Sequence, residues 1–188
     1  MITMKQREEA IARSKPLFAR CGIAISDAEY ADMEVADFGL SDRYHQGAQI
    51  ITLINTARVG FKLICLLPGQ TLPEHWHTVR PEDPFTDAKE ETLRVLLGTM
   101  YLYVPGEDTI ARGRVPQGSA AHYTCRSERV LDAAHRQETL PPGTKHWMQG
   151  GPEGTVVASV STAATCAYDP FTDPNIVRTT VIKEEPTS

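Results

Sequence analysis

The chain has 188 residues, of which 41% are hydrophobic and 23% are charged, and its formal net charge at pH 7 is −5. This length predicts one domain with a core of its own, and the acidic balance, without any cluster of lysines or arginines, argues against a nucleic-acid partner. No apolar run is long enough to cross a membrane, and the polar N-terminus is unlike a signal peptide, so we expect a cytoplasmic protein without a membrane partner.

Residues 1–36 are predicted to form a helical extension that packs outside the main sheet. Apolar residues recur at helical spacing in KQREEAIARSKPLFARCG, but Pro16 should break or kink this helix, because its ring removes a hydrogen bond and clashes with the preceding turn. Ser26 and Glu29 have the spacing of a capping box, in which each side chain caps the other's backbone N–H. They predict a second, short helix that runs toward Val35.

Residues 37–181 are predicted to form an all-β domain. Short runs rich in β-branched and aromatic residues follow one another, separated by turn-forming residues and without helices between them. This pattern is typical of an antiparallel sandwich or barrel. The runs are AQIITLINT, FKLICLLPG, TLPEHWH, ETLRVLLG, TMYLYVPG, HYTCRSERVLD, ETLPPGT and GTVVASVST. We expect residues 78–88 to form a long polar loop beside the functional site, and residues 182–188 to form a frayed tail.

Three histidines and one glutamate form a candidate metal site. His75 and His77 are one residue apart in PEHWH, so on an extended strand both side chains point to the same face. Glu91 follows a loop later, with Glu90 as the alternative in another register, and His146 follows a Pro-Pro-Gly turn. Three imidazoles and a carboxylate can hold a divalent metal ion and leave coordination positions open for a substrate. The four scattered cysteines form no C-x-x-C pair, so nitrogen and oxygen are the expected ligands.

Two lysines are candidates for contact with a substrate. Lys62 interrupts the apolar run FKLICLL, where a charged side chain is unfavourable unless it is paired or useful. Its ammonium group either holds a substrate oxygen near the metal or reaches solvent from the edge of the sheet. Lys89 precedes Glu91 by two positions and therefore shares its strand face.

The spacing of these residues reproduces the cupin pattern, G…HxH…E…G followed by PxG…H, in which four ligands converge inside a small jelly-roll β-barrel. Longer segments resemble those of the small D-lyxose isomerases: GQTLPEHWH, KEETLRVLLGTMYLYVPGE, AHYTC, LPPGTKHWMQGGPEGTVV and YDPFTDPNI. The likeness extends from about Asp37 to Arg178, and FTDP is a specific marker of it. It implies a single-domain cupin, all-β with a short N-terminal helical cap.

The resemblance also implies an activity. The chain would be a metal-dependent aldose–ketose isomerase that interconverts D-lyxose and D-xylulose, and D-mannose and D-fructose, through a cis-enediol intermediate. The substrate would be a free sugar and the assembly a homodimer. The expected metal is Mn2+, with Zn2+, Co2+, Ni2+ and Fe2+ as alternatives, and the implied ligands are His75, His77, Glu91 and His146. The implied catalytic residues are Lys62 and Glu91. The implied substrate contacts are Lys62, Lys89 and Asp173.

One position departs from the family pattern. The glutamate expected to carry the proton between C1 and C2 falls on Ser159, and its strand, GTVVASVST, holds no carboxylate. A serine cannot do this work unaided near neutral pH. The alternatives for the base are Asp169, Asp173 or a metal-bound hydroxide. Without any base, the chain would be a metal-dependent cupin of another activity, such as an epimerase, a sugar-phosphate isomerase or a dioxygenase, or a non-catalytic sugar-binding cupin.

Overall fold

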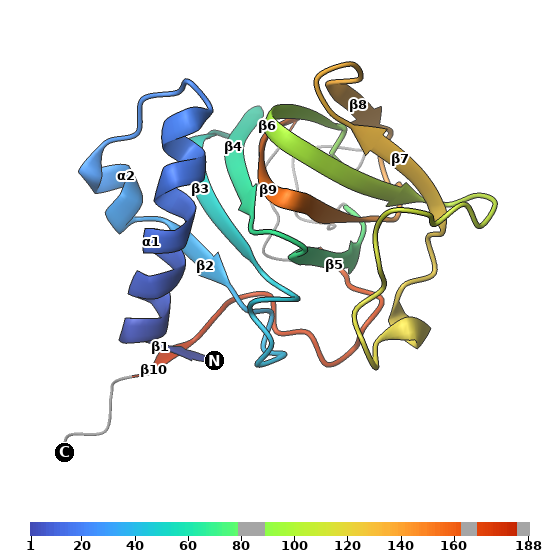
Figure 1. Ribbon diagram of the computed structural model, residues 1–188, viewed down its shortest axis with the longest axis horizontal. Helices are drawn as coiled ribbons and strands as arrows, with labels where there is room; N and C mark the ends of the chain where they lie inside the picture. Colours follow the sequence, from blue (N-terminus) through green and yellow to red (C-terminus); the bar gives the residue numbers. More distant parts are fainter. Residues whose placement is uncertain (79–88, 163–168, 184–188) are drawn as a thin grey trace.

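The computed structural model describes residues 1–78, 89–162 and 169–183 (Figure 1). In chain order the elements are β1 (Ile2–Thr3), α1 (Met4–Arg20), α2 (Asp27–Ala31), β2 (Glu34–Ala36), β3 (Ala48–Asn55), β4 (Val59–Leu66), β5 (Thr71–His75), β6 (Glu91–Val104), a 3-10 turn (Ala120–His122), β7 (Ser127–Leu131), β8 (Gln137–Leu140), β9 (His146–Thr162) and β10 (Ile182–Lys183). Neither α-helix in this part of the chain is long and apolar enough to cross a bilayer.

Helix α1 runs through Pro16 without ending there, so the predicted break is wrong. A capping box of Thr3 and Gln6 starts the helix, and it continues to Arg20. Leu17 and Phe18, directly after the proline, are buried against the sheet. Burying two such side chains contributes about 1.5–3 kcal/mol each, which is enough to offset the roughly 3 kcal/mol that an interior proline costs.

The second helix begins where the sequence predicts and ends earlier. The side chains and backbone N–H groups of Ser26 and Glu29 bond reciprocally, so the capping box is confirmed. The helix ends at Ala31, however, and the residues around Val35 form strand β2, which pairs antiparallel with β3. Val35 is buried in this strand. Here the pairing with β3 outweighs the continuation of a short helix.

The strands form one curled antiparallel sheet with the order β2-β3-β4-β9-β6-β7, to which β5 adds through β9 and β8 through β6. The long strands β6 and β9 pair with each other. In addition, the first residues of β9 pair with β5 and the first residues of β6 pair with β8. These pairings bend the sheet around an apolar interior. Helix α1 lies against the outer face of the sheet (Figure 1). Its Phe18 belongs to the same apolar cluster as Leu63 and Val156. The all-β, cupin-like domain is therefore confirmed.

The C-terminal segment does not begin to fray where the sequence predicts. Ile182 and Lys183 form β10, which pairs in parallel with β1 next to the start of α1 (Figure 1). The rest of the predicted tail, from residue 184, lies outside the described residues. So does the predicted polar loop beside the site, except for Thr78.

Gly98, a glycine of the predicted pattern, lies at a close approach of β6 and β9. Gly98 has φ +73° and lies at an irregularity in the register between the two strands. A Cβ atom at this position would lie 2.1 Å from the backbone carbonyl oxygen of Gly154. Both the left-handed backbone and the missing side chain are therefore required for the sheet to bend here.

We expect Gly98→Ala to lower the free energy of unfolding by about 3 kcal/mol or more, because it combines an unfavourable φ with a clash against backbone. Gly118 is the matched control: its φ is +80°, but nothing lies within 4 Å of an added Cβ. Gly118→Ala should therefore lower stability by only about 1 kcal/mol. Urea denaturation of both variants measures the difference, and equal losses would contradict the role of the close approach.

Candidate metal centre

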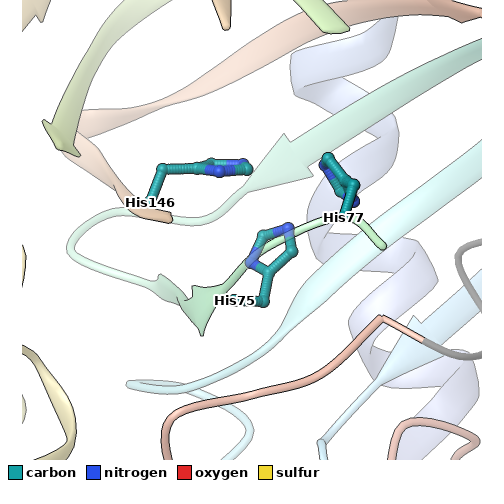
Figure 2. Close-up of side chains that lie close together, drawn as sticks. All are labelled: His75, His77 and His146. Atoms are coloured by element: carbon teal, nitrogen blue, oxygen red, sulfur yellow. The ribbon is translucent and has the colours of Figure 1, made fainter. Parts of the chain in front are cut away.

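The three histidines of the predicted site meet at one end of the sheet. His75 is the last residue of β5 and His146 the first of β9, and the two are directly paired across the strands. His77 lies beyond the end of β5, so the two histidines of PEHWH do not share one strand as predicted. Figure 2 shows the three rings close together, and one ligand atom from each lies within 4.8 Å of the others.

Backbone carbonyl groups orient two of the imidazole rings. Nδ1 of His75 lies 2.8 Å from the carbonyl oxygen of Pro73, and Nδ1 of His146 lies 2.9 Å from that of Thr144. A ring that donates from Nδ1 keeps its lone pair on Nε2, which is the usual arrangement of a metal-bound histidine. Nε2 of His146 is buried and has no hydrogen-bond partner among the described residues. Such an unsatisfied acceptor fits a bound cation.

Glu91 supplies the carboxylate of the site. Its Oε2 lies 3.0 Å from Nε2 of His77 and 3.6 Å from Nε2 of His146. Its Oε1 accepts a hydrogen bond of 2.5 Å from Ser159 Oγ and lies 3.5 Å from Lys89 Nζ. The alternative residue, Glu90, is exposed to solvent. The structure thus brings Glu91, and not Glu90, to the histidines.

Burial sets the protonation of most of the cluster. It lowers the pKa of His146 to about 4 and holds that of His75 well below its usual value, so both rings are neutral at pH 7. Burial alone would raise the pKa of Glu91. The charge of Lys89 and the contact with His77 outweigh this effect and hold the pKa of the carboxyl well below its usual range. The site therefore offers two neutral imidazoles and an ionised carboxylate.

His77 differs from the other two histidines because it lies between two carboxylates. Its Nδ1 is 2.9 Å from Oδ2 of Asp169, an ion-pair distance without the angle of a hydrogen bond, and Nε2 faces Glu91. Burial disfavours the charged ring, yet Asp169 and Glu91 together raise the pKa of His77 to about 9. Without a metal, this ring is protonated at pH 7. A cation bound at Nε2 would take the place of that proton.

Three of the four candidate ligands, His75, His77 and Glu91, line a small cavity, which we call the metal cavity. Apolar side chains such as Phe38, Ile64 and Met148 form part of its wall. Five polar side chains complete it, and two of them, Lys62 and Lys89, are predicted substrate contacts. The five are Lys62, Lys89, Ser159, Asp169 and Arg178. A partly apolar wall with a few polar groups is a usual arrangement for a small-molecule site.

Asp173, the third predicted substrate contact, is not among the described residues that line the metal cavity. Its carboxylate accepts hydrogen bonds from the backbone and side chain of Asn175 and lies 3.8 Å from His122 Nε2. It therefore shapes the turn after the FTDP segment. The prediction that it touches the sugar gains no support from this position.

The FTDP segment contacts the site through its first two residues. The ring of Phe171 lies 5.4 Å from that of His75, and Thr172 donates a hydrogen bond of 2.6 Å to Glu74. Glu74 is fully buried on the face opposite the histidines and also accepts from Cys125 N at 2.6 Å. Glu74 thus links the FTDP segment to strand β5, so this segment has a structural role beside the site.

The sequence analysis did not identify Arg178 as a site residue. It follows the last recognisable motif, and no local pattern distinguishes it from other arginines. Only the return of the chain across β2 brings it to the wall of the metal cavity. Its guanidinium pairs with Glu34, which is not among the described residues that line this cavity.

No family model matches the chain. Curated relatives align along nearly all of it. A D-lyxose ketol-isomerase of Cohnella laeviribosi is 45% identical over 176 residues, 93% of this chain and 94% of the relative. A D-lyxose/D-mannose isomerase of Thermosediminibacter oceani is 41% identical over 166 residues, 88% and 90% of the two chains. A D-lyxose ketol-isomerase of a Thermofilum species is 37% identical over 179 residues, 95% and 97%.

Solved structures share the fold at much lower identity. An L-ribose isomerase of Cellulomonas parahominis aligns with a TM-score of 0.76 at 16% identity, covering 97% of this chain and 98% of the other. An L-ribose isomerase of Geodermatophilus obscurus gives 0.74 at 14% identity with the same coverage. These structures support the fold, whereas the family follows from the curated relatives. With close to half of its residues identical over almost its full length, the chain belongs to the D-lyxose isomerase family.

Proposed function

We propose that the protein is a metal-dependent aldose–ketose isomerase that interconverts D-lyxose and D-xylulose, and D-mannose and D-fructose. The observation that carries this proposal is the buried cluster of three histidines beside Glu91 at the wall of a cavity. It occurs in a chain whose relatives at 37–45% identity are named as isomerases of these sugars. A divalent ion held by the cluster would supply Lewis-acid stabilisation of the negative charge that develops on O1 and O2.

The lysines of the cavity have different roles in this proposal. Among the described residues, none forms an ion pair with Lys62, whose side chain lines the metal cavity. Its ammonium group is therefore available to donate to a substrate oxygen and to balance the charge of the enediol. Lys89 lies beside Glu91 and keeps this carboxylate ionised, so that it can serve as a ligand.

Asp169 is the proposed base. Ser159, at the expected base position, donates a hydrogen bond from its hydroxyl to Glu91. In this proposal it orients a ligand and does not transfer the proton between C1 and C2. Asp169 is the remaining carboxylate at the wall of the metal cavity, within the described residues, that is not a proposed ligand. A carboxylate in this place can take the proton from C2 and return it to C1. Its contact with His77 holds it in position.

Three finer points are carried over from the resemblance. We propose Mn2+ as the bound metal, since the resemblance implies it and three nitrogens and one carboxylate are compatible with it. The alternatives are zinc, cobalt, nickel and iron. We further propose a homodimer and a cytoplasmic location.

The central experiment measures ketose formation from D-lyxose and D-mannose by metal-stripped protein, with and without Mn2+. We expect turnover only with the metal. His75→Ala should lose more than about 100-fold in kcat/KM and its stoichiometric metal. His135→Ala, which removes an exposed histidine from a turn, is the matched control and should retain both. Metal binding without turnover of either sugar would refute the isomerase and leave a binding protein.

Metal binding should release protons in a defined pH range. Because the pKa of His77 is raised to about 9 while His75 and His146 are neutral, we expect close to one proton per metal ion between pH 7 and pH 8. Release should fall as the pH rises through 9, since the ring is then neutral before the metal binds. Apparent affinity should increase about tenfold from pH 7 to pH 8. Calorimetry in two buffers of different ionisation enthalpy measures this, and affinity independent of pH would contradict it.

Two substitutions separate the base from the residue that orients a ligand. At saturating metal, Asp169→Asn should lower kcat by about 10²–10⁴-fold, as expected for loss of a general base. Ser159→Ala should weaken metal binding by about tenfold, yet keep kcat within a few fold once metal is saturating. If Asp169→Asn also recovers full kcat at high metal concentration, Asp169 only positions His77.

A further inference from the structure

The metal cavity is too small for a whole sugar. Its volume is about 40 Å³. A cavity needs about 10–15 Å³ by this measure to hold one water molecule, so there is room for roughly three waters. That space suits the reacting end of a sugar, C1 and C2 with their oxygens. The remaining carbons of a pentose or hexose must extend beyond it.

A second cavity adjoins the first and is large enough for the rest of the sugar. This outer cavity has a volume of about 470 Å³. It shares Lys62 and Arg178 with the metal cavity, and its other walls include Glu34 of β2, Asn55 at the end of β3 and Thr180. The two shared side chains therefore mark the boundary that a substrate bound at the metal would cross.

The charged groups of Glu34 and Arg178 in the outer cavity are paired with each other. Arg178 forms two contacts with Glu34, one of them 3.3 Å between Nη2 and Oε2. Arg7 also lines the cavity, and its guanidinium donates to the carbonyl oxygens of Ala31 and Met33, the latter at 2.9 Å. A phosphate dianion would have to compete with Glu34 for Arg178. Neutral hydroxyl groups, in contrast, can donate to the carboxylate and accept from the guanidinium without breaking the pair.

Glu34 is placed to make such contacts. Its side chain is 35% exposed and that of Arg178 is 18% exposed. Both side chains line the outer cavity. Asn55, at the end of β3, adds an amide that both donates and accepts. A carboxylate, a guanidinium and an amide together offer a hydroxyl-bearing chain the donors and acceptors that it needs.

We propose that the outer cavity is the subsite for the non-reacting end of the sugar, with the Glu34–Arg178 pair binding the hydroxyls beyond C3. This inference rests on the proposed isomerase function, and it assigns a substrate class to the cavity: the neutral polyol end of a pentose or hexose. The volume admits the additional carbon of D-mannose over D-lyxose. The pair acts on substrate affinity and takes no part in the proton transfer.

Substrate truncation combined with mutation tests the subsite. L-Glyceraldehyde keeps the C2 configuration of D-lyxose and has no carbon beyond C3. Glu34→Gln should lower kcat/KM about tenfold for D-lyxose and D-mannose, mainly through KM, and change it less than about twofold for L-glyceraldehyde. Asn55→Ala, which leaves the ion pair intact, should show the same pattern at about threefold. Glu9→Gln breaks an exposed ion pair with Arg43 and should change nothing.

Equal losses for all three sugars would mean that Glu34 only supports the fold and would overturn the subsite. So would unchanged kinetics in both Glu34→Gln and Asn55→Ala, while the isomerase function stood. Tighter binding of D-mannose 6-phosphate than of D-mannose would overturn the inference that the outer cavity takes an uncharged end of the sugar.

Calorimetric titration of the metal-loaded protein separates the subsite from the activity. If the wild-type protein turns over no sugar but binds D-lyxose, and Glu34→Gln weakens that binding about tenfold, the subsite stands and the isomerase falls. Neither binding nor turnover in the wild-type protein would overturn both.

Discussion

The register between β5 and β9 is the constraint on which the site depends. It sets His75 directly opposite His146, so the two rings meet at the end of the sheet. A slip of one residue would turn every side chain of β5 to the other face and would bring Glu74 to the place of the histidine. Glu74 opposes that slip, because its buried carboxylate is satisfied only on its present side, by Thr124, Thr172 and the backbone of Cys125.

Electrostatic compensation explains how so many polar groups stay buried together. Glu91 lies beside Lys89, Ser159 and the protonated ring of His77, so its charge is shared among several donors. Removing any one partner would leave an uncompensated charge in a closed space, which costs far more than the pair contributes. The cluster is consequently a costly arrangement for stability alone. A bound cation would offset this cost, because it would satisfy both the carboxylate of Glu91 and Nε2 of His146.

Much of the fold, and the grouping of three histidines with Glu91, could be predicted because the information is local. The alternation around His75, the turn before His146 and the glycine at 98 are short patterns, and each has one structural meaning. The errors have a common cause in tertiary contacts. Pro16 stays within a helix because its neighbours are buried, and Val35 joins a strand because β3 is next to it. Propensity yields to packing in both places.

The positions of the remaining polar groups could not be read from the sequence for a similar reason. Asp169 and Asp173 are both acidic residues of the same short segment, but only the path of the chain directs the former to His77 and the latter to Asn175. Arg178 gives no local signal at all. It reaches the barrel because residue 177 bonds to the backbone of Phe38 and Thr180 bonds to Asp37, which together fasten the C-terminal segment across β2.

That fastening separates two tasks along the chain. The groups that would hold a metal come from β5 and the residues directly after it, from β6 and from β9. The wall of the outer cavity comes largely from β2 and from a segment that leaves the barrel before pairing with β1. Changes in the returning segment therefore alter the mouth of the barrel without touching the register that aligns the histidines. In this chain, the residues that would set how long a sugar fits are therefore separate from those that would hold the metal.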